Sequence, residues 1–274
     1  MSKQANNFQF QKGLLAKGQE KLFTFIGDLT WQGAKCPFWV VYAPTSYKLK
    51  GDDSDTVSRL IYDNHLRPGD VFLRKYDKYW SSFFIPGDLK HAGMYVGKIA
   101  WEDGIKRHTV VHSMSEGVLK ANAIDFFRTD HAVIFRPSLP EKACELAAKR
   151  ALDCLGRPYD FDFRYTDHKA LYCTELIGYA YDFTDEERQT LKENYNFTDD
   201  DLVFRFHLVK EKRIGATREV LLADNIMLSN GEVMFMSKGM DKTEVFKKYT
   251  ELRLKEGTTP NFALHVLKMD KMSL

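Results

Sequence analysis

The stretch HAGMYVGKIAWEDGIKRHTVVHS at positions 91–113 decides the fold. Its outer segments, 91–97 and 108–113, are short runs rich in β-branched, apolar and aromatic residues, which is typical of strands. Between them stands the pair Asp103-Gly104, which is favoured in tight turns because both residues tolerate a positive φ. The stretch therefore predicts two antiparallel strands joined as a hairpin.

Further helices and strands are expected on both sides of this hairpin. In chain order they are a short helix near 54–64, the strand VFLR (71–74), the strand AVIFRP (132–137), a helix at 140–155 and a second helix that begins at Cys173. Antiparallel strands mixed with helices predict an α+β fold, in which an antiparallel sheet packs on helices.

Both ends of the chain extend beyond this core. Residues 8–35 carry apolar positions spaced like one helical stripe, which predicts a helix packed on the main domain or, alternatively, one that contacts a membrane surface or a partner. Residues 184–274 have a mixed pattern that fits a subdomain or lid. We therefore expect an N-terminal helical extension (1–65), a core (66–183) and a C-terminal extension (184–274) packed on that core.

The composition excludes several classes of protein. With 44% hydrophobic and 14% aromatic residues, the chain has the makeup of a folded protein rather than of a disordered one. Its 40 basic and 38 acidic residues give a net charge of +2, which argues against a nucleic-acid partner. The longest apolar run, at 38–43, is far shorter than the roughly 20 residues that a membrane span needs. The N-terminus shows no apolar signal segment, so we expect a cytoplasmic protein. The sequence does not indicate its oligomeric state.

One cysteine of the four differs from the rest. Cys144, Cys154 and Cys36 lie in apolar surroundings and fit small core residues. Cys173 stands at the start of a helix, where unpaired N–H groups and the helix dipole favour a thiolate and lower a cysteine pKa by roughly one to several units. The same N–H groups can receive a developing oxyanion. Cys173 is the candidate nucleophile, with an inert helix-start cysteine as the alternative.

A nucleophilic cysteine needs a base, and the base needs an orienting partner. His91 stands at the entrance of an apolar strand, and His112 lies inside the next strand, where a satisfied, half-buried histidine is the structural alternative. With a strict two-residue turn, His91 would face Glu116 and lie some 13 Å from His112, at about 3.3 Å per residue. A bulge or a looser loop would bring His112 closer. Both His112 and Glu116 therefore remain candidates for the third position.

Several motifs in a fixed order carry a family resemblance. They are GDVFLR (69–74), SSFFIPGDLKHAGMYVG (81–97), VVHSMSEGV (110–118), LGRPYDFDF (155–163) and YCTELIGYAY (172–181). Over roughly residues 66–182 the chain resembles the YiiX/YebB-like cysteine hydrolases, from the permuted branch of the NlpC-type, papain-like superfamily.

The resemblance implies a permuted papain-like fold, a sheet or half-barrel in which the histidine strand precedes the cysteine helix along the chain. It also implies His91 as the base, Cys173 as the nucleophile and His112 as the polar third residue, a position that is often Glu in relatives. No cofactor and no metal are implied.

The leading hypothesis is a thiol-dependent hydrolase with a Cys-His-His or Cys-His-Glu site. It would cleave an amide or ester bond of a small-molecule, peptide or lipid substrate through a thioester acyl-enzyme. The alternative passes the acyl group to an acceptor, as do lipid acyltransferases and phospholipases of the lecithin retinol acyltransferase type. In that case the aromatic residues Tyr79-Trp80 and Phe83-Phe84 would support peripheral membrane contact.

Two further hypotheses have weaker support in the sequence. A metal site on His108 and His112 lacks an accompanying Cys-x-x-Cys or His-Glu-x-x-His motif. A non-catalytic binding module is the most remote alternative, because all the proposed site residues are present.

Overall fold

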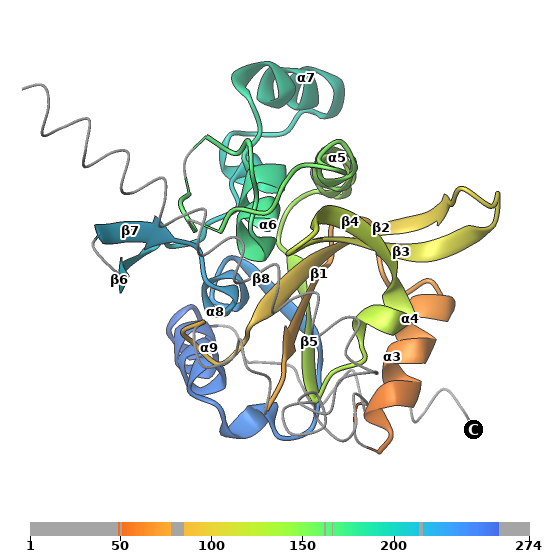
Figure 1. Cartoon of the computed structure of the whole chain (residues 1–274). Helices are drawn as coiled ribbons and strands as arrows, with labels where there is room; N and C mark the ends of the chain where they lie inside the picture. The colour runs from red at the N-terminus through yellow and green to blue at the C-terminus, as the bar shows by residue number, and fades with distance from the viewer. Residues whose placement is uncertain are drawn as a thin grey trace, which may run out of the picture.

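A six-stranded antiparallel sheet forms the centre of the structure, with the strand order β4-β3-β2-β1-β5-β8 (Figure 1). The structure is a computed structural model that describes residues 49, 51–77, 85–161, 163–165, 167–213 and 216–257. Its strands are β1 (Val71–Lys75), β2 (His91–Ala100), β3 (Lys106–Met114), β4 (Gly117–Asn122), β5 (His131–Pro137) and β8 (Gly231–Met236). The predicted α+β fold with an antiparallel sheet is confirmed.

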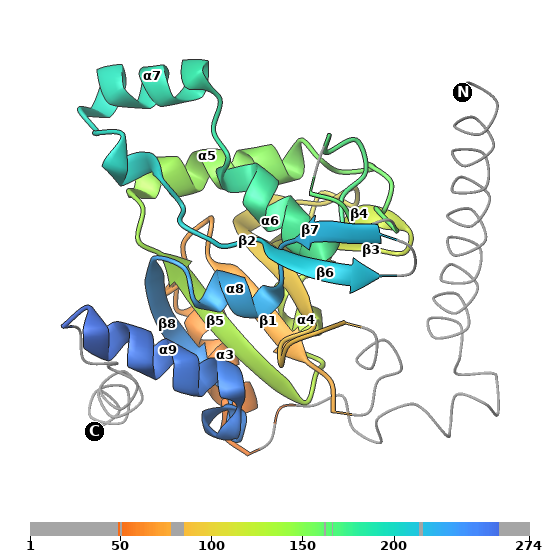
Figure 2. The same cartoon turned by 90° about the vertical axis from the view of Figure 1, so that its left-hand side faces the viewer.

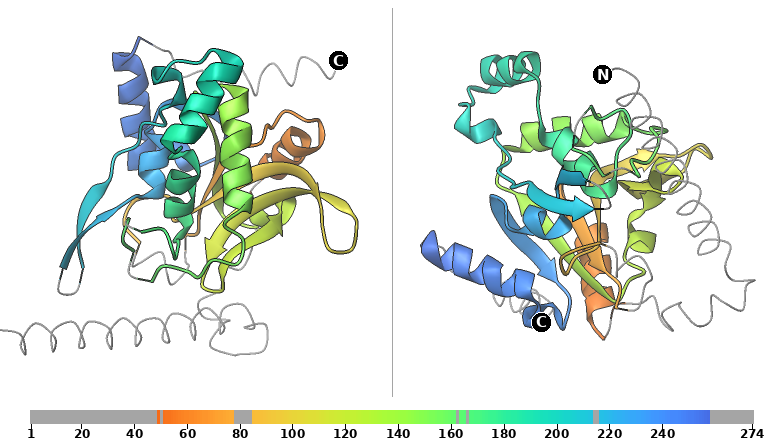
Figure 3. Two further views of the ribbon diagram at one scale, coloured as in Figure 1. Left: turned by 90° about the horizontal axis from the view of Figure 1, so that it is seen from above. Right: turned by 60° about the vertical axis from the view of Figure 1, so that its left-hand side comes forward.

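Helices cover both sides of this sheet (Figures 2 and 3). On one side, here called the α3 side, pack α3 (Asp53–Tyr62) and α4 (Ala123–Phe126). On the other, the α6 side, pack α5 (Glu141–Leu152), α6 (Cys173–Tyr181), α8 (Ala223–Met227) and α9 (Glu244–Lys255). The outer elements are α7 (Asp185–Tyr195), two 3₁₀ turns (Asp200–Leu202 and Met240–Lys242) and a β-ribbon of β6 (Val209–Arg213) and β7 (Ala216–Val220).

The two sides follow from the alternation of side chains along each strand. In β1, Val71 and Leu73 enter the core on the α6 side, whereas Phe72 enters the core on the α3 side. In β2, Met94 and Tyr95 divide in the same way. A sheet that is apolar on both faces has to be covered on both, which explains its central position.

The connection between β2 and β3 differs from a tight hairpin. The strand pairing ends at Ala100 and Lys106, and the loop Trp101–Ile105 joins them. A β-bulge then shifts the register between Tyr95 and Gly97, where Gly97 has a φ of +89°. The strict two-residue turn at Asp103-Gly104 is therefore wrong, and the looser loop with a bulge is confirmed.

The C-terminal part of the chain contributes to the central sheet. Strand β8 pairs with β5 at the sheet edge. The predicted borders of the three segments stay a prediction. Side chains of α8, β8 and α9 lie in the same hydrophobic core as those of β1 and β2. The expected N-terminal helix at 8–35 lies outside the described residues.

Gly93 in β2 is a position where the fold needs a residue without a side chain. A Cβ atom there would lie 2.6 Å from Cγ1 of Val110 and 2.7 Å from Cε2 of Phe126. We expect Gly93→Ala to lower the free energy of unfolding by about 1–3 kcal/mol, because overpacking forces these buried groups to move. Urea unfolding measures this loss. An unchanged unfolding midpoint would contradict the close packing of β2 against α4.

Candidate active site

Cys173 is the first residue of α6, and its side chain is 7% exposed. Neighbouring groups hold the start of this helix in place. The Glu175 carboxylate accepts a hydrogen bond from the Tyr172 backbone N–H (3.4 Å), and the Ser113 hydroxyl of β3 donates to the Leu171 carbonyl (2.5 Å). The helix therefore begins at a fixed point against β3.

The sulfur of Cys173 lies where β2 leaves β3. The β2–β3 pairing starts only at Met94 and Val111, so the beginning of β2 is free to face another element. The backbone N–H groups of Ala92 and Thr174 lie at the sulfur and stabilise its thiolate form, as does the positive charge of Arg74. Ala92 directly follows His91, so the helix start lies beside the backbone at the predicted base, whereas the His91 ring itself packs against Phe126 on the α3 side.

Burial nevertheless raises the pKa of the Cys173 thiol above its ordinary value of 9.0. Loss of hydration disfavours the charged form by more than the N–H groups and Arg74 favour it. The expectation of a lowered pKa is wrong for this structure, because the helix start is covered and not open to water. The resting group is a thiol.

The two predicted histidines lie in contact. Nε2 of His91 and Nδ1 of His112 are 2.9 Å apart, and the two rings meet edge to face. Phe126 of α4 packs against both rings on the α3 side, nearly parallel to His91 and edge-on to His112. This contact depends on the bulge in β2, because an unbroken ladder would carry His91 toward the β3–β4 turn.

Both histidines are held in the neutral form. Burial lowers the pKa of His91 well below its ordinary value of 6.5, and the charge of Arg74 lowers it further. Burial and then Arg74 lower the pKa of His112 to about 3. A neutral imidazole keeps a free lone pair over a wide pH range, but the same low pKa makes His91 a weaker base.

Glu116, the other candidate for the third position, lies elsewhere. It is exposed in the turn between β3 and β4, where its carboxylate accepts a hydrogen bond from the Ser115 hydroxyl (2.9 Å). The geometry thus favours His112 over Glu116 as the partner of His91. Among the described residues, the Cys173 thiol makes no hydrogen bond to either ring, and such contacts are often long before substrate binds.

The loops before His91 and before Cys173 are anchored to one short segment, 221–224. The Leu221 carbonyl accepts a hydrogen bond from the Thr174 hydroxyl (2.6 Å), and the Leu221 backbone N–H donates one to the Tyr172 hydroxyl (2.9 Å). The Asp224 carboxylate accepts hydrogen bonds from the backbone N–H groups of Leu89 and Asp88, which lie two and three residues before His91. The C-terminal part of the chain therefore positions both halves of the site.

Two of the remaining cysteines and His108 have structural surroundings. Cys144 and Cys154 are fully buried free thiols in the core, as expected, while Cys36 lies outside the described residues. His108 bonds through Nδ1 to the Tyr95 hydroxyl at 2.7 Å. Within the described ranges, no group of three or more His, Cys, Asp or Glu side chains is arranged to hold a metal ion.

Sequence reasoning missed two residues of the site. Phe126 contacts both rings from the α3 side, and Arg74 lies beside His91 in the register of β1 and β2. The alternation of side chains along VFLR already places Arg74 on the same face of the sheet as Phe72. This pattern does not reveal that the Arg74 side chain is buried.

Comparison with known proteins supports the predicted fold. Residues 65–248 match the family of the permuted papain-like amidase enzymes, YaeF/YiiX, C92 family. Because this match spans more than half of the chain, the protein belongs to that family. The permuted papain-like fold and the resemblance to YiiX are thereby confirmed.

A solved structure and the curated proteins were compared as well. The chain is similar to the crystal structure of metalloprotein yiiX from Escherichia coli O157:H7, at 17% sequence identity and a TM-score of 0.39, covering 60% of this chain and 92% of that chain. No curated protein matches. Among the described helices, none is long and apolar enough to cross a membrane.

The neutral state of His112 predicts how stability depends on pH. Between pH 6.5 and about 3 the unfolded chain binds a proton at this residue that the folded chain does not. The free energy of unfolding should therefore fall as the pH drops through this window, by about 1.4 kcal/mol per pH unit for one such group. Above pH 6.5 this contribution is constant.

The variant His112→Asn tests this dependence by urea unfolding at pH 7.5 and 5.5. It should lose less stability between the two values than the wild type, since the titrating ring is gone. His65→Asn, at an exposed position, serves as the matched control and should follow the wild type. An equal loss in wild type and His112→Asn would show that His112 is not held neutral.

Proposed function

We propose that this protein is a cysteine hydrolase that cleaves an amide bond through a thioester on Cys173. The family is one of amidases, which supports the class of reaction. The observation that carries the assignment of residues is the position of Cys173 at the start of α6 beside Ala92, the residue after His91. His91 in turn contacts His112 at 2.9 Å.

The proposal requires one arrangement of protons at the histidine contact. If Nε2 of His91 donates its proton to Nδ1 of His112, Nδ1 of His91 carries a free lone pair. That nitrogen makes no hydrogen bond with the described residues and is the proposed acceptor of the thiol proton. His112 would orient His91 and share the positive charge that forms on it, as the third member of a triad does.

The proposed reaction then has two halves. The sulfur of Cys173 attacks the carbonyl carbon while its proton passes to His91, and the backbone N–H of Cys173 helps to hold the oxyanion. His91 returns the proton to the leaving amine as the carbon–nitrogen bond breaks. Water, deprotonated by His91, hydrolyses the thioester to a carboxylic acid and restores the thiol.

Transfer of the acyl group to a lipid acceptor remains the second candidate reaction. The residues that would support lipid contact, 79–84 and the stripe at 8–35, lie outside the described residues. Turnover of phospholipid without hydrolysis of amides would favour this candidate over the amidase.

Substitution of the nucleophile tests the proposal directly. Cys173→Ala should reduce hydrolysis of acyl p-nitroanilides by a factor on the order of 10⁴ or more, because removal of a covalent nucleophile leaves only background catalysis. Intact-mass spectrometry of the wild type should show an acyl adduct that the variant lacks. Cys154→Ala, a core cysteine changed in the same way, is the control and should keep its adduct. An adduct on Cys173→Ala would assign the chemistry elsewhere.

The two candidates for the third position separate in the same assay. We expect His112→Asn to lower kcat by roughly 10- to 1,000-fold, because His91 loses a specific orienting partner. Glu116→Gln should stay within about twofold of wild type, as surface changes away from a site usually do. The reverse order would assign the third position to Glu116.

The protonation states predict the dependence of activity on pH. Because His91 stays neutral well below pH 6.5, kcat/KM should keep its value into mildly acidic solution and fall only at lower pH. Alkylation of Cys173 by iodoacetamide without substrate should be slow at pH 7 and rise above pH 9, where the thiol ionises. A plateau of alkylation between pH 5 and 8 would instead show a resting thiolate.

A further inference from the structure

Arg74 is a buried cation directly beside the histidine pair. It occupies the fourth position of β1, is 8% exposed and pairs in register with His91. Its guanidinium carbon lies 4.4 Å from the centre of the Phe126 ring, and Nη1 donates to the Phe126 carbonyl (3.0 Å). The guanidinium is thus held by one backbone oxygen and two aromatic rings, those of Phe126 and, at 5.3 Å, of Tyr76.

The remaining donors of Arg74 have no strong partner. The nearest acceptor of Nη2 is the sulfur of Met114 at 3.9 Å, and Nε is buried with no hydrogen-bond partner among the described residues. No described carboxylate lies within ion-pair distance of it. The segment that follows in the chain, 78–84 (KYWSSFF), contains no acidic residue.

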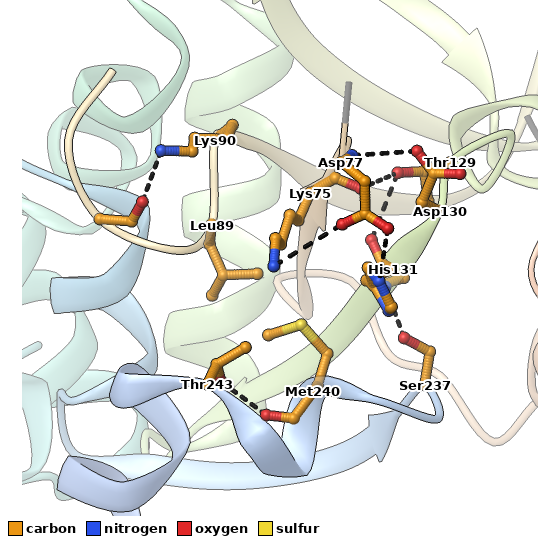
Figure 4. Close-up of polar contacts among 12 residues, drawn as sticks. Lys75, Asp77, Leu89, Lys90, Thr129, Asp130, His131, Ser237, Met240 and Thr243 are labelled. Atoms are coloured by element: carbon orange, nitrogen blue, oxygen red, sulfur yellow. Dashed lines mark hydrogen bonds and ion pairs between the residues drawn. The ribbon is translucent and has the colours of Figure 1, made fainter. Parts of the chain in front are cut away.

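Two other basic residues of the sheet are compensated. At the opposite end of β5, Arg136 forms a two-point ion pair with the buried Asp70, with its shorter contact at 2.7 Å. Lys75, the next residue of β1, faces Asp77 at 3.7 Å, and Asp77 also contacts His131 (Figure 4). The lack of a carboxylate at Arg74 is therefore a local property of the site and not of this end of the sheet.

An unpaired guanidinium is costly to bury, and its planar donors match a carboxylate at two points. The charge of Arg74 acts on His91, His112 and Cys173, all of which are neutral in the resting protein. The group it would complement is thus missing from the described residues, and a bound molecule could supply it.

We propose that Arg74 binds a carboxylate of the substrate, so that the enzyme prefers acyl donors that carry an anionic group close to the scissile carbonyl. This inference rests on the proposed function, since it takes Cys173 as the nucleophile. It also gives Arg74 a second effect, because a bound carboxylate offsets the positive charge next to His91. Substrate binding would then make His91 a better acceptor of the thiol proton.

Two alkylating reagents of similar size test this proposal. Iodoacetate carries a carboxylate and iodoacetamide does not, and both form the same carbon–sulfur bond with release of iodide. The rates at Cys173 are measured separately by digestion and mass spectrometry. In the wild type, the ratio of the iodoacetate rate to the iodoacetamide rate should exceed that in Arg74→Gln by about tenfold or more, the size expected for a hydrogen bond to a charged group. Lys75→Gln, with the same change of charge on the adjacent residue, should keep the wild-type ratio.

The outcomes separate the two proposals. An equal change of both rates in Arg74→Gln would overturn anion recognition while leaving Cys173 as an accessible nucleophile. If neither reagent alkylates Cys173 in the folded wild type, that result counts against Cys173 as the nucleophile.

A binding experiment then tests the role of Arg74 separately. Acetate, but not acetamide, should raise the Tm of Cys173→Ser, and it should fail to do so when Arg74→Gln is added. Arg74→Lys keeps the charge but not the planar donors, so its ratio of alkylation rates should lie between those of the wild type and Arg74→Gln. This variant replaces Arg74→Gln if the latter does not fold. An unchanged Tm in acetate, or a ratio of rates in Arg74→Lys equal to that of the wild type, would overturn carboxylate recognition.

Discussion

The register between β2 and β3 determines which side chains can meet at the end of this sheet. The bulge near Gly97 shifts the pairing of β2 with β3 by one residue, so that Met94 pairs with Val111 and the register, continued toward the start of β2, sets His112 opposite Gly93. His91 therefore contacts His112, and the backbone after His91 remains free to face the start of α6. Gly93 allows Phe126 to close in from the other side of the sheet, so the histidine pair is packed as well as paired.

This packing gives the site an electrostatic character of its own. Where many triads hold the imidazole with a carboxylate, the described surroundings of His91 contain a second neutral ring and a cation. A negative partner would stabilise an ion pair between thiolate and imidazolium in the resting state. Its absence from the described residues favours a thiol and a neutral imidazole until a substrate is present. The separation of charge is then postponed to the reaction itself.

Much of this arrangement could be predicted from the sequence, and the failures have physical reasons. The strands around His91 and His112 and the helix start at Cys173 have strong local patterns, so their positions follow from short-range rules. Strand β8 pairs with β5 across about a hundred residues of chain, and no local pattern encodes such a partner. The burial of Arg74 likewise depends on α4 packing over the sheet, whereas a basic residue near the end of a strand is usually exposed. The raised pKa of Cys173 was missed for the same reason, since covering of the helix start is a tertiary effect.

The anchoring of both loops to residues 221–224 has a consequence for how the protein is made. The loop before His91 is fastened to Asp224 and the start of α6 to Leu221, and both anchors come later in the chain than either reactive residue. A nascent chain that ends before residue 221 has neither of them, although its histidine strands and its cysteine are already synthesised. Assembly of the proposed site thus awaits synthesis of residues 221–224, and before that point these anchors cannot fix the loop before His91 or the start of α6.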